Sequence, residues 1–579
     1  MRRLPLIWTI LFLTGFLTFP ADAEMHNVPD DFDMIQDAVE AAVPGDTILV
    51  AEGSYAENVN YRGKDLVIGS EFLLDGDFQH VLNTIIDGSE PAHPDTGSCV
   101  LMISGETRAA ELVGFTLTGG DGTPVLDSIT NSRWTEGGGV HMNESSPTVR
   151  HNLIIGNTVT VAKAGTGNAG GGGLRTGYGA PLVTHNIIMD NTGNYGGAVV
   201  VNESDAEFYN NIVIGNEVRN ALGGGTFWVW GPGTASVYHN NTVAGNTSTS
   251  LNTAGMYNWG TEVEIVNCIF WGNDNQDLRG TQNPEYDVSY SVIEGGYENG
   301  ESILDLHPGF AEAGLLLAPD SPLVDAGDPS VEFNDPEDPE EAGQALAPAL
   351  GTITADIGAY GGPYTEPLLP FSRDDFTIST DIVTFNTTPV GFQTAEELIV
   401  SNGGSVHVSM DSAQISLVSG EGVALVNELP LSLEAVSSDT LTLTWLPEST
   451  EELLADLLIY HTSEGRENPL ILTLIGDVET GVHDEIDGTT VPKTYYLSGS
   501  YPNPFNAVAT VQFGLPTTSA VTLRVYNSLG REVATLLDGT LQAGVHKAIF
   551  NGRDLASGVY LVRMQTAGFV QVQPMVLTK

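Results

Sequence analysis

A motif of asparagine, a mostly apolar triplet and a second asparagine recurs between residues 151 and 273. It reads HNLIIGN at 151–157, HNIIMDN at 185–191, NNIVIGN at 210–216, NNTVAGN at 240–246 and NCIFWGN at 267–273. One unit of this size is too small to bury its own apolar side chains, so similar units must stack on one another. The motif therefore predicts a repeat architecture in which equivalent residues lie in columns.

Glycine clusters precede these motifs, and the spacing between the two features is nearly constant. From the last glycine of each cluster to the closing asparagine there are 18, 18, 19, 21 and 18 residues. The distance from a closing asparagine to the next cluster varies from 6 to 16 residues. A constant length indicates a packed path, and a variable length indicates loops at one corner. Units of 25–34 residues with short β segments and no helix predict a parallel β-helix, with coils stacked ~4.8 Å apart.

The repeated asparagines have two interpretations, a row of ligand-binding side chains or a ladder of stacked amides. Asn186 and Asn191, for example, keep a fixed register with the apolar triplet between them. Stacked amides hydrogen-bond readily from coil to coil, and buried polar groups need such partners. The register favours a structural ladder.

Residues that follow the glycine clusters predict a candidate binding face. Alternation along a strand places Val140, Leu174 and Val199 inward and their neighbours His141, Arg175 and Val200 outward. Aromatic side chains then take over the outward positions, with Glu136 and Tyr195 nearby. Aromatic plates beside polar groups are typical of carbohydrate sites. The alternative is that the rings pack beneath the variable loops. The predicted substrate-binding residues are Glu136, His141, Arg175, Trp228, Trp230, Tyr257 and Trp259.

No catalytic residue can be assigned from the sequence. A polysaccharide lyase on such a fold needs a base, for which Arg175 is the candidate, and a hydrolase needs paired carboxylates. Glu136, Glu144, Glu203 and Asp205 are the candidate acids, but they form no recognisable acidic motif. No set of metal ligands stands out, and calcium in carboxylate-rich loops is the one cation that the composition suggests.

The chain ends and the charge indicate an exported protein. A basic start, an apolar run and a small-residue box predict a signal peptide over residues 1–23. No later segment is apolar enough to span a membrane. Lys and Arg number 20 against 74 Asp and Glu, a net charge of −54, which argues against nucleic-acid binding. Cys99 and Cys268 are too few to staple a chain of this length, so we expect small buried thiols, with one disulfide as the alternative.

Changes of pattern divide the remaining chain into domains. Residues 24–365 form the expected β-helix, whose N-terminal capping helix buries Ile35, Ala38, Val39 and Ala42. The acidic stretch 331–341 is expected to be a solvated loop. Longer alternating strands predict a β-sandwich over 371–477. A linker over 478–494 leads to a small β domain over 495–579.

Three resemblances add to these expectations. MIQDAVEAAVPGDTILVAEGSYAENV, TIIDG, GFTLTGG and the glycine–asparagine coils resemble the right-handed parallel β-helix family of the pectin-lyase type. This resemblance implies the fold but no activity, because that fold carries lyases, hydrolases, epimerases and proteins without known catalysis. Residues 371–477 are similar to immunoglobulin-like domains of bacterial surface proteins.

The C-terminal segments YPNPFNAVATVQFGLP, VTLRVYNSLGREV, AGVHKAIFNGRDLASGVYLVRM and MVLTK resemble the sorting domain of the type IX (Por) secretion pathway. Ala507 stands where a second proline is common in that family. This resemblance implies recognition by the type IX secretion machinery and a secreted or cell-surface location.

The expected protein is therefore all-β, with a right-handed parallel β-helix, an immunoglobulin-like sandwich and a C-terminal sorting domain. The leading functional hypothesis is binding of extracellular polysaccharide without identifiable catalysis. The alternatives are a polysaccharide lyase or glycoside hydrolase that uses the same face, and a structural adhesin.

Overall fold

The computed structural model describes residues 23–578 with internal gaps. The gaps are 92–95, 128–130, 164, 220–224, 250–253, 282–285, 312–313, 479–491, 502, 504, 506–507, 528–530, 553–554, 556 and 567. Of the predicted signal peptide only Ala23 is among the described residues, and most of the predicted linker lies outside them. The same holds for Pro502, Pro504 and Ala507 of the C-terminal motif.

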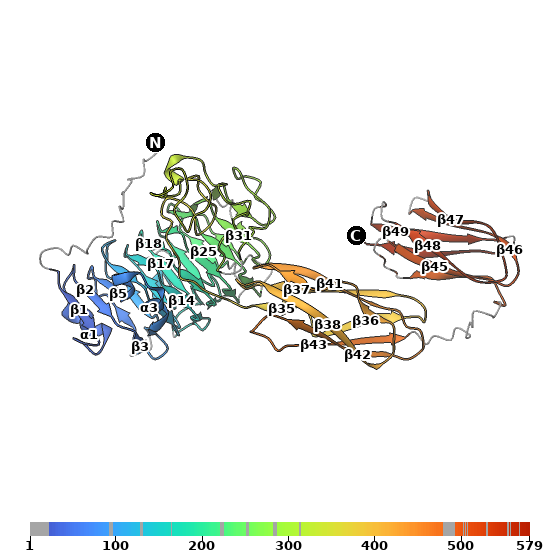
Figure 1. Cartoon of the computed structure of the whole chain (residues 1–579), viewed down its shortest axis with the longest axis horizontal. Coiled ribbons are helices and arrows are strands. Elements are labelled where there is room, and N and C mark those ends of the chain that lie inside the picture. The colour runs from blue at the N-terminus through green and yellow to red at the C-terminus, as the bar shows by residue number, and fades with distance from the viewer. Residues whose placement is uncertain are drawn as a thin grey trace.

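The N-terminal region, coloured blue to green in Figure 1, is a parallel β-helix built from three long sheets. The first sheet contains β1 (Met25–Val28), β2 (Thr47–Val50), β5 (Val67–Ser70), β8 (Glu111–Val113), β13 (Thr148–Arg150), β18 (Leu182–Thr184), β22 (Glu207–Tyr209), β26 (Ala235–His239), β30 (Glu262–Val266) and β33 (Tyr286–Ser289). The second sheet contains β3 (Gly53–Tyr55), β6 (Thr84–Asp87), β9 (Thr116–Thr118), β14 (Leu153–Ile155), β19 (Ile187–Met189), β23 (Ile212–Ile214), β27 (Thr242–Ala244), β31 (Ile269–Trp271) and β34 (Val292–Ile293). The third sheet contains β4 (Val59–Asn60), β7 (Val100–Met102), β12 (Val140–Met142), β17 (Leu174–Gly177), β21 (Val199–Asn202), β25 (Phe227–Trp230), β29 (Met256–Asn258) and β32 (Leu278–Gly280).

Each coil within the stack contributes one strand to each sheet, and among the described residues only the end coils lack one, so equivalent residues stack in register. Four coils add a short strand to a fourth sheet, with β15 (Thr158–Val159), β20 (Thr192–Gly193), β24 (Glu217–Val218) and β28 (Thr247–Ser248). Val140 pairs with Leu174, and Leu174 pairs with Val199. All three side chains are fully buried in one continuous core, as the alternation predicted. The predicted β-helix fold is confirmed.

The repeated asparagines form two amide ladders inside the wall. At the closing position of the motif, Asn157, Asn191, Asn216 and Asn246 each donate a side-chain hydrogen bond over 2.8–3.0 Å to the asparagine of the next coil, and the ladder ends at Asn273. A second ladder joins Asn152, Asn186, Asn211 and Asn241 over 3.0–3.1 Å. All nine side chains are buried. The structural interpretation of the repeat is confirmed.

Both cysteines are free and buried, so the expectation of small buried thiols is confirmed. Cys268 occupies the next position of the second ladder, where its Sγ accepts a hydrogen bond from the backbone N–H of Asn241 over 3.3 Å. Burial raises the pKa of each thiol to about 12.

A short helix closes the N-terminal end of the stack, as predicted. Helix α1 (Ile35–Ala41) buries Ile35, Ala38 and Val39 against the first coils. The Glu57 carboxylate accepts hydrogen bonds from the backbone N–H groups of Ile35 and Gln36, both over 2.9 Å. Two further helices that the sequence analysis missed, α2 (Phe72–Asp75) and α3 (Phe78–Asn83), lie between β5 and β6.

The second region, orange in Figure 1, is a sandwich of two sheets. One sheet contains β35 (Phe376–Ile378), β37 (Thr394–Asn402), β39 (Val423–Leu425) and β41 (Ser437–Trp445). The other contains β36 (Ile382–Thr388), β38 (Val408–Ser419), β40 (Leu431–Leu433), β42 (Leu453–His461) and β43 (Leu470–Val478). Apart from the parallel pair β36 and β43, neighbouring strands run antiparallel. The fully buried Trp445 lies at the centre of their shared core.

In three of the motifs, the glycine that precedes the closing asparagine lets this sandwich contact the β-helix closely. Gly215, Gly245 and Gly272 all have positive φ, which few other residues adopt readily. A Cβ on Gly245 would lie 2.9 Å from the Gly403 carbonyl, and one on Gly272 would collide with Val436. Arg373 completes the contact, because its Nε lies 2.9 Å from an Asp190 carboxylate oxygen.

The C-terminal region, red in Figure 1, is a second, smaller β-sandwich. Its sheets contain β44 (Tyr496–Tyr501), β45 (Val508–Leu515) and β48 (Gly544–Asn551), and β46 (Ser519–Asn527), β47 (Glu532–Leu541), β49 (Gly558–Gln565) and β50 (Val570–Leu577). Phe505, Phe513 and Phe550 lie in its core.

Candidate functional site

Strand register brings most of the predicted binding residues into one column on the outer side of the third sheet. From β12 to β32 the column runs His141, Arg175, Val200, Trp228, Tyr257 and Arg279. Trp230 lies two residues beyond Trp228 on β25, beside Asn202 of β21. The prediction that these outward positions line up along the stack is confirmed.

An inserted hairpin covers the first half of this column. Strands β10 (Thr123–Asp127) and β11 (Ser132–Glu136) pair antiparallel, and β11 pairs with the short strand β16 (Ala169–Gly170). Arg175 is 0% exposed, and Glu136 and His141 are each 2% exposed. The expectation that these three residues are accessible to a ligand was wrong. Alternation shows that a side chain points away from the core of the β-helix, but it does not show whether another strand, here β11, covers that side chain.

The buried polar groups form one network around the Glu136 carboxylate. Arg175 Nε donates to one carboxylate oxygen over 2.9 Å, and the Tyr195 hydroxyl donates to the other over 2.7 Å. His141 Nδ1 lies 2.9 Å from the Glu136 backbone carbonyl. Burial, with the Arg175 charge, lowers the pKa of His141 to about 3. A charged guanidinium held this way anchors the hairpin, and it cannot reach a polysaccharide as a base.

Beyond the hairpin, four aromatic residues form what we call the aromatic strip: Trp228, Trp230, Tyr257 and Trp259. The three tryptophans are partly exposed, whereas Tyr257 is only 6% exposed. Tyr257 and Trp259 have ring centroids 5.4 Å apart at an interplanar angle of 43°, so the two rings contact each other. The buried Trp259 Nε1 has no hydrogen-bond partner among the described residues. The strip offers apolar plates on neighbouring coils.

Carboxylates lie at the edge of the same sheet. Glu144 and Asp205 are exposed, and Glu203 is partly exposed at the end of β21. Partial burial and the nearby Asp127 charge raise the pKa of Glu203. The Tyr178 hydroxyl donates to an Asp127 carboxylate oxygen over 3.1 Å. Glu203 and Asp127 are two carboxylates that influence each other beside the strip, and a glycoside hydrolase needs a pair of carboxyl groups.

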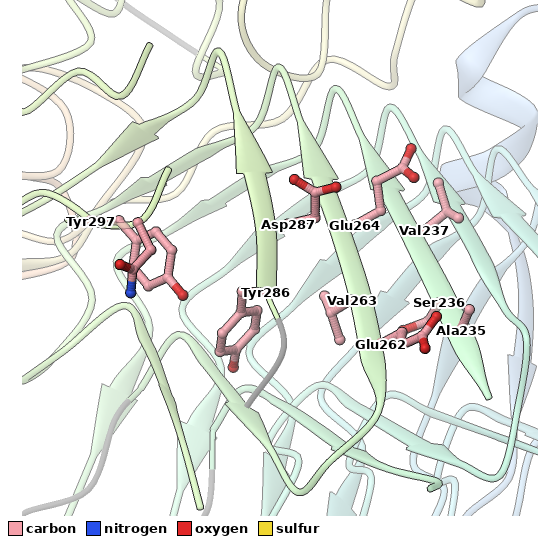
Figure 2. Close-up of a pocket in the computed structure, with 10 residues that line it drawn as sticks. Ala235, Ser236, Val237, Glu262, Val263, Glu264, Tyr286, Asp287 and Tyr297 are labelled. Carbon is pink, nitrogen blue, oxygen red and sulfur yellow. The ribbon is translucent and has the colours of Figure 1, made fainter. Parts of the chain in front are cut away.

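A separate acidic hollow of about 450 Å³ lies on the first sheet, across β26, β30 and β33 (Figure 2). Glu264 and Asp287 project from neighbouring strands at one end, and Glu262 projects near Ser236 at the other. Tyr286 forms part of the floor. Glu262, Glu264 and Asp287 are all exposed, so these carboxylates face water.

A column of turn residues, one from each coil and each just before a strand of the second sheet, holds the end of the β-helix region in place. Residues 355–366, which we call the closing strap, run back along five successive coils, from Asn267, whose carbonyl accepts a hydrogen bond from the Gly358 N–H, to His151. Asn240 donates to the carbonyls of residues 356 and 358, and Asn210 donates to those of residues 359 and 361. Next, His185 Nε2 lies 2.8 Å from the Tyr364 carbonyl, and His151 Nε2 lies 3.1 Å from a Glu366 carboxylate oxygen.

An aspartate from the predicted solvated loop fixes the same strap. Asp335 is only 3% exposed, although most of its neighbours in 331–341 are exposed. Its carboxylate accepts hydrogen bonds from the backbone N–H groups of Asp356 and Gly362. Burial, with the neighbouring Asp356 charge, raises the pKa of Asp335 to about 8. The expectation for this loop was therefore wrong at Asp335, whose role depends on the distant strap.

Similarity to known proteins is specific only at the C-terminus. Residues 500–578 match the family described as "Secretion system C-terminal sorting domain". No curated protein matches the sequence.

Solved structures match weakly. The PapD-like domain 7 of human CEP192 is 16% identical, with 20% of this chain and 95% of that chain covered and a TM-score of 0.14. Domains 5–6 of the S-layer protein SbsC are 8% identical (36% and 99% covered, TM-score 0.14). The secreted serine protease VesC from Vibrio cholerae is 10% identical (36% of this chain and 52% of VesC covered, TM-score 0.15). Scores this low carry no argument about function.

Two observations bear on where the protein works. Among the described residues, no helix combines the length and apolar character needed to cross a bilayer. The C-terminal match implies recognition by the type IX secretion machinery. With its type IX sorting domain at residues 500–578, this parallel β-helix protein is a secreted or cell-surface protein.

Proposed function

We propose that this exported protein binds neutral extracellular polysaccharide along the aromatic strip. The observation that carries the proposal is the partial exposure of Trp228, Trp230 and Trp259 on two neighbouring coils of one sheet. Sugar rings stack on such plates through their apolar faces. Coils ~4.8 Å apart suit an extended chain better than a single sugar.

Charge supports a neutral ligand over an acidic one. The chain has a net charge of −54, so a polyanionic glycan would be repelled at long range. The nearest cation in the column, Arg279, is a single charge in register with Tyr257. The buried Arg175 is already neutralised by Glu136. The column therefore offers little compensation for glycan carboxylates.

Affinity electrophoresis through gels that contain neutral or acidic polysaccharides tests this proposal. We expect at least one neutral polysaccharide to retard the wild-type protein. Trp230→Ala with Trp259→Ala should reduce the retardation about tenfold, the loss of roughly 1.4 kcal/mol of binding.

The matched control is Tyr460→Ala, which removes an exposed aromatic ring from the sandwich domain and should leave retardation unchanged. If no polysaccharide retards the protein, or if the double variant is retarded like the wild type, the proposal is wrong. The structural-adhesin alternative would then be favoured.

A second candidate function is glycoside hydrolysis next to the strip. It is favoured by Glu203, whose raised pKa suits a general acid, and by the neighbouring Asp127. Release of reducing ends from the polysaccharide that binds, and its loss in Glu203→Gln, would support hydrolysis. Binding without any release of reducing ends would leave only the non-catalytic function.

A further inference from the structure

Three potential metal ligands converge where the closing strap ends. One ring nitrogen each from His151 and His185 and one Glu366 carboxylate oxygen all lie within 4.8 Å of one another. Both histidines are buried, with their rings stacked 5.0 Å apart at an interplanar angle of 6°. Among the described residues, this is the one group of three or more His, Cys, Asp or Glu side chains with such spacing.

The donor set matches the chemistry of a divalent transition metal. Two imidazoles and a carboxylate are ordinary ligands of Zn²⁺ and of its spectroscopic substitute Co²⁺. Ligand atoms in a tetrahedral site lie roughly 3.3 Å apart when metal–ligand distances are about 2.0 Å. Binding one ion therefore requires the ligand atoms, now within 4.8 Å of one another, to move closer and the stacked rings to rotate toward a common point. Glu366, whose side chain is 30% exposed, supplies both a negative charge and a route from solvent.

Hydrogen bonds around His185 allow it to switch from strap contact to metal binding. Its Nδ1 lies 2.7 Å from the Thr184 hydroxyl, and its Nε2 lies 2.8 Å from the Tyr364 carbonyl. A hydroxyl can either donate or accept, so Thr184 can hold the tautomer that leaves Nε2 free to bind a metal. His151 Nδ1 is buried with no partner among the described residues, so that ring also has a nitrogen not committed to the protein.

Strap docking alone does not explain the two histidines. His151 and His185 share a positive-φ turn column with Asn210 and Asn240, at φ values of 52–56°. At those two later coils, asparagine adopts the same backbone and bonds the strap carbonyls directly. Asparagine also tolerates this conformation better than most residues. His185 also faces a strap carbonyl, that of Tyr364, but the Glu366 carboxylate lies within 4.8 Å of a ring nitrogen of each histidine.

We propose that His151, His185 and Glu366 bind one divalent transition-metal ion of the Zn²⁺ class, which fastens the closing strap to the coils that begin at residues 151 and 185. The ion would join two neighbouring coils to Glu366, which lies 181 residues beyond His185 and 215 beyond His151 (366 − 185 and 366 − 151). Such a cross-link stabilises the folded β-helix, because the ligands are not preassembled in the unfolded chain. This inference is independent of polysaccharide binding.

Titration of the purified, metal-stripped protein with Co²⁺ tests the site directly. We expect one equivalent to bind with the visible absorption of a low-symmetry site, Zn²⁺ to displace it, and the melting temperature to rise with either ion. His185→Asn should weaken Co²⁺ binding at least tenfold. It retains a strap-bonding amide like that of Asn210, so the apo protein should keep its circular dichroism spectrum.

Glu366→Gln provides a second variant that does not alter the strained turn, and it should weaken binding similarly. His239→Asn is the control, because His239 forms a more exposed pair with Glu264 at 2.8 Å and should leave binding unchanged. The proposal is overturned if the wild-type protein binds no stoichiometric Co²⁺ or Zn²⁺. It is equally overturned if both His185→Asn and Glu366→Gln bind the ion as tightly as the wild type.

Discussion

Removal of one amide from the middle of a ladder should strongly destabilise the β-helix. Asn216 Oδ1 accepts hydrogen bonds from both the backbone N–H and the side-chain Nδ2 of Asn191, each over 3.0 Å. Its own Nδ2 donates to Asn246 Oδ1 over 3.0 Å and to the Ile188 carbonyl over 2.9 Å. Asn216 is 0% exposed, so water cannot replace these partners without opening the wall.

The expected magnitude follows from the donors that lose their acceptor. In Asn216→Ala, two buried N–H donors of Asn191 lose the Asn216 oxygen. At about 1–3 kcal/mol for each unsatisfied group, the free energy of unfolding falls by roughly 2–6 kcal/mol. Exposed Asn83→Ala is the control, and we expect it to change stability by less than about 0.5 kcal/mol.

Asn216→Asp makes the same position sensitive to pH. The Asn216 nitrogen faces three acceptors, the Asn246 amide oxygen and the carbonyls of Ile188 and Ile214, so an ionised carboxylate oxygen there would be repelled by all three. Burial should raise the folded-state pKa of the new carboxyl above its unfolded value of about 3.9. A raised folded pKa means that the variant is most stable below about pH 4 and loses stability as pH rises toward that folded pKa.

Urea unfolding followed by tryptophan fluorescence measures these effects. Five tryptophans lie between residues 134 and 271, so the signal reports mainly on the β-helix. The reasoning is refuted if Asn216→Ala unfolds within about 0.5 kcal/mol of the wild type. It is also refuted if the stability of Asn216→Asp relative to the wild type is the same at pH 4 and pH 8.

Three other predictions follow from the structure. Gly272→Ala should destabilise more than Gly156→Ala in urea unfolding, since both have positive φ but only Gly272 faces Val436 closely; equal effects would contradict the described domain contact. Arg175→Met should lower the free energy of unfolding by about 3–5 kcal/mol, because the Glu136 carboxylate stays buried without its charged partner. Adding Glu136→Gln should restore part of the lost stability, and a loss below about 1 kcal/mol in Arg175→Met would refute the anchoring role. The pKa of Asp335 is raised to about 8, so its contribution to stability is present at pH 4 and is lost as pH rises through 8. The melting temperature of Asp335→Asn should fall less between pH 4 and pH 8 than that of the wild type, and an equal fall in both proteins would contradict this prediction.

Periodicity predicted the parts of the fold that depend on neighbouring residues. The ladder asparagines, the inward valines and leucine, and the capping helix all follow from spacing within one repeat. The β10–β11 hairpin is different, because its partner strand and the residues it covers belong to later coils. Alternation therefore placed Arg175 correctly on the outer side but could not show that it is buried.

The strap contacts could not be predicted for the same reason. Glu366 meets His151, and Asp335 meets Gly362, through tertiary contacts between segments with no shared pattern. One signal was present in the sequence. The residue before the first ladder asparagine changes from His to Asn along the repeats, and the two histidines are the ones that lie near Glu366.

Oxidative footprinting of the tryptophans, with and without the polysaccharide that retards the protein most, tests the central claim most directly. Mass spectrometry measures the oxidation of each indole. The account predicts that bound polysaccharide protects Trp228, Trp230 and Trp259, while the buried Trp445 reacts slowly in both states. Equal oxidation of the three strip tryptophans with and without bound polysaccharide would contradict the claim that this face is the binding site.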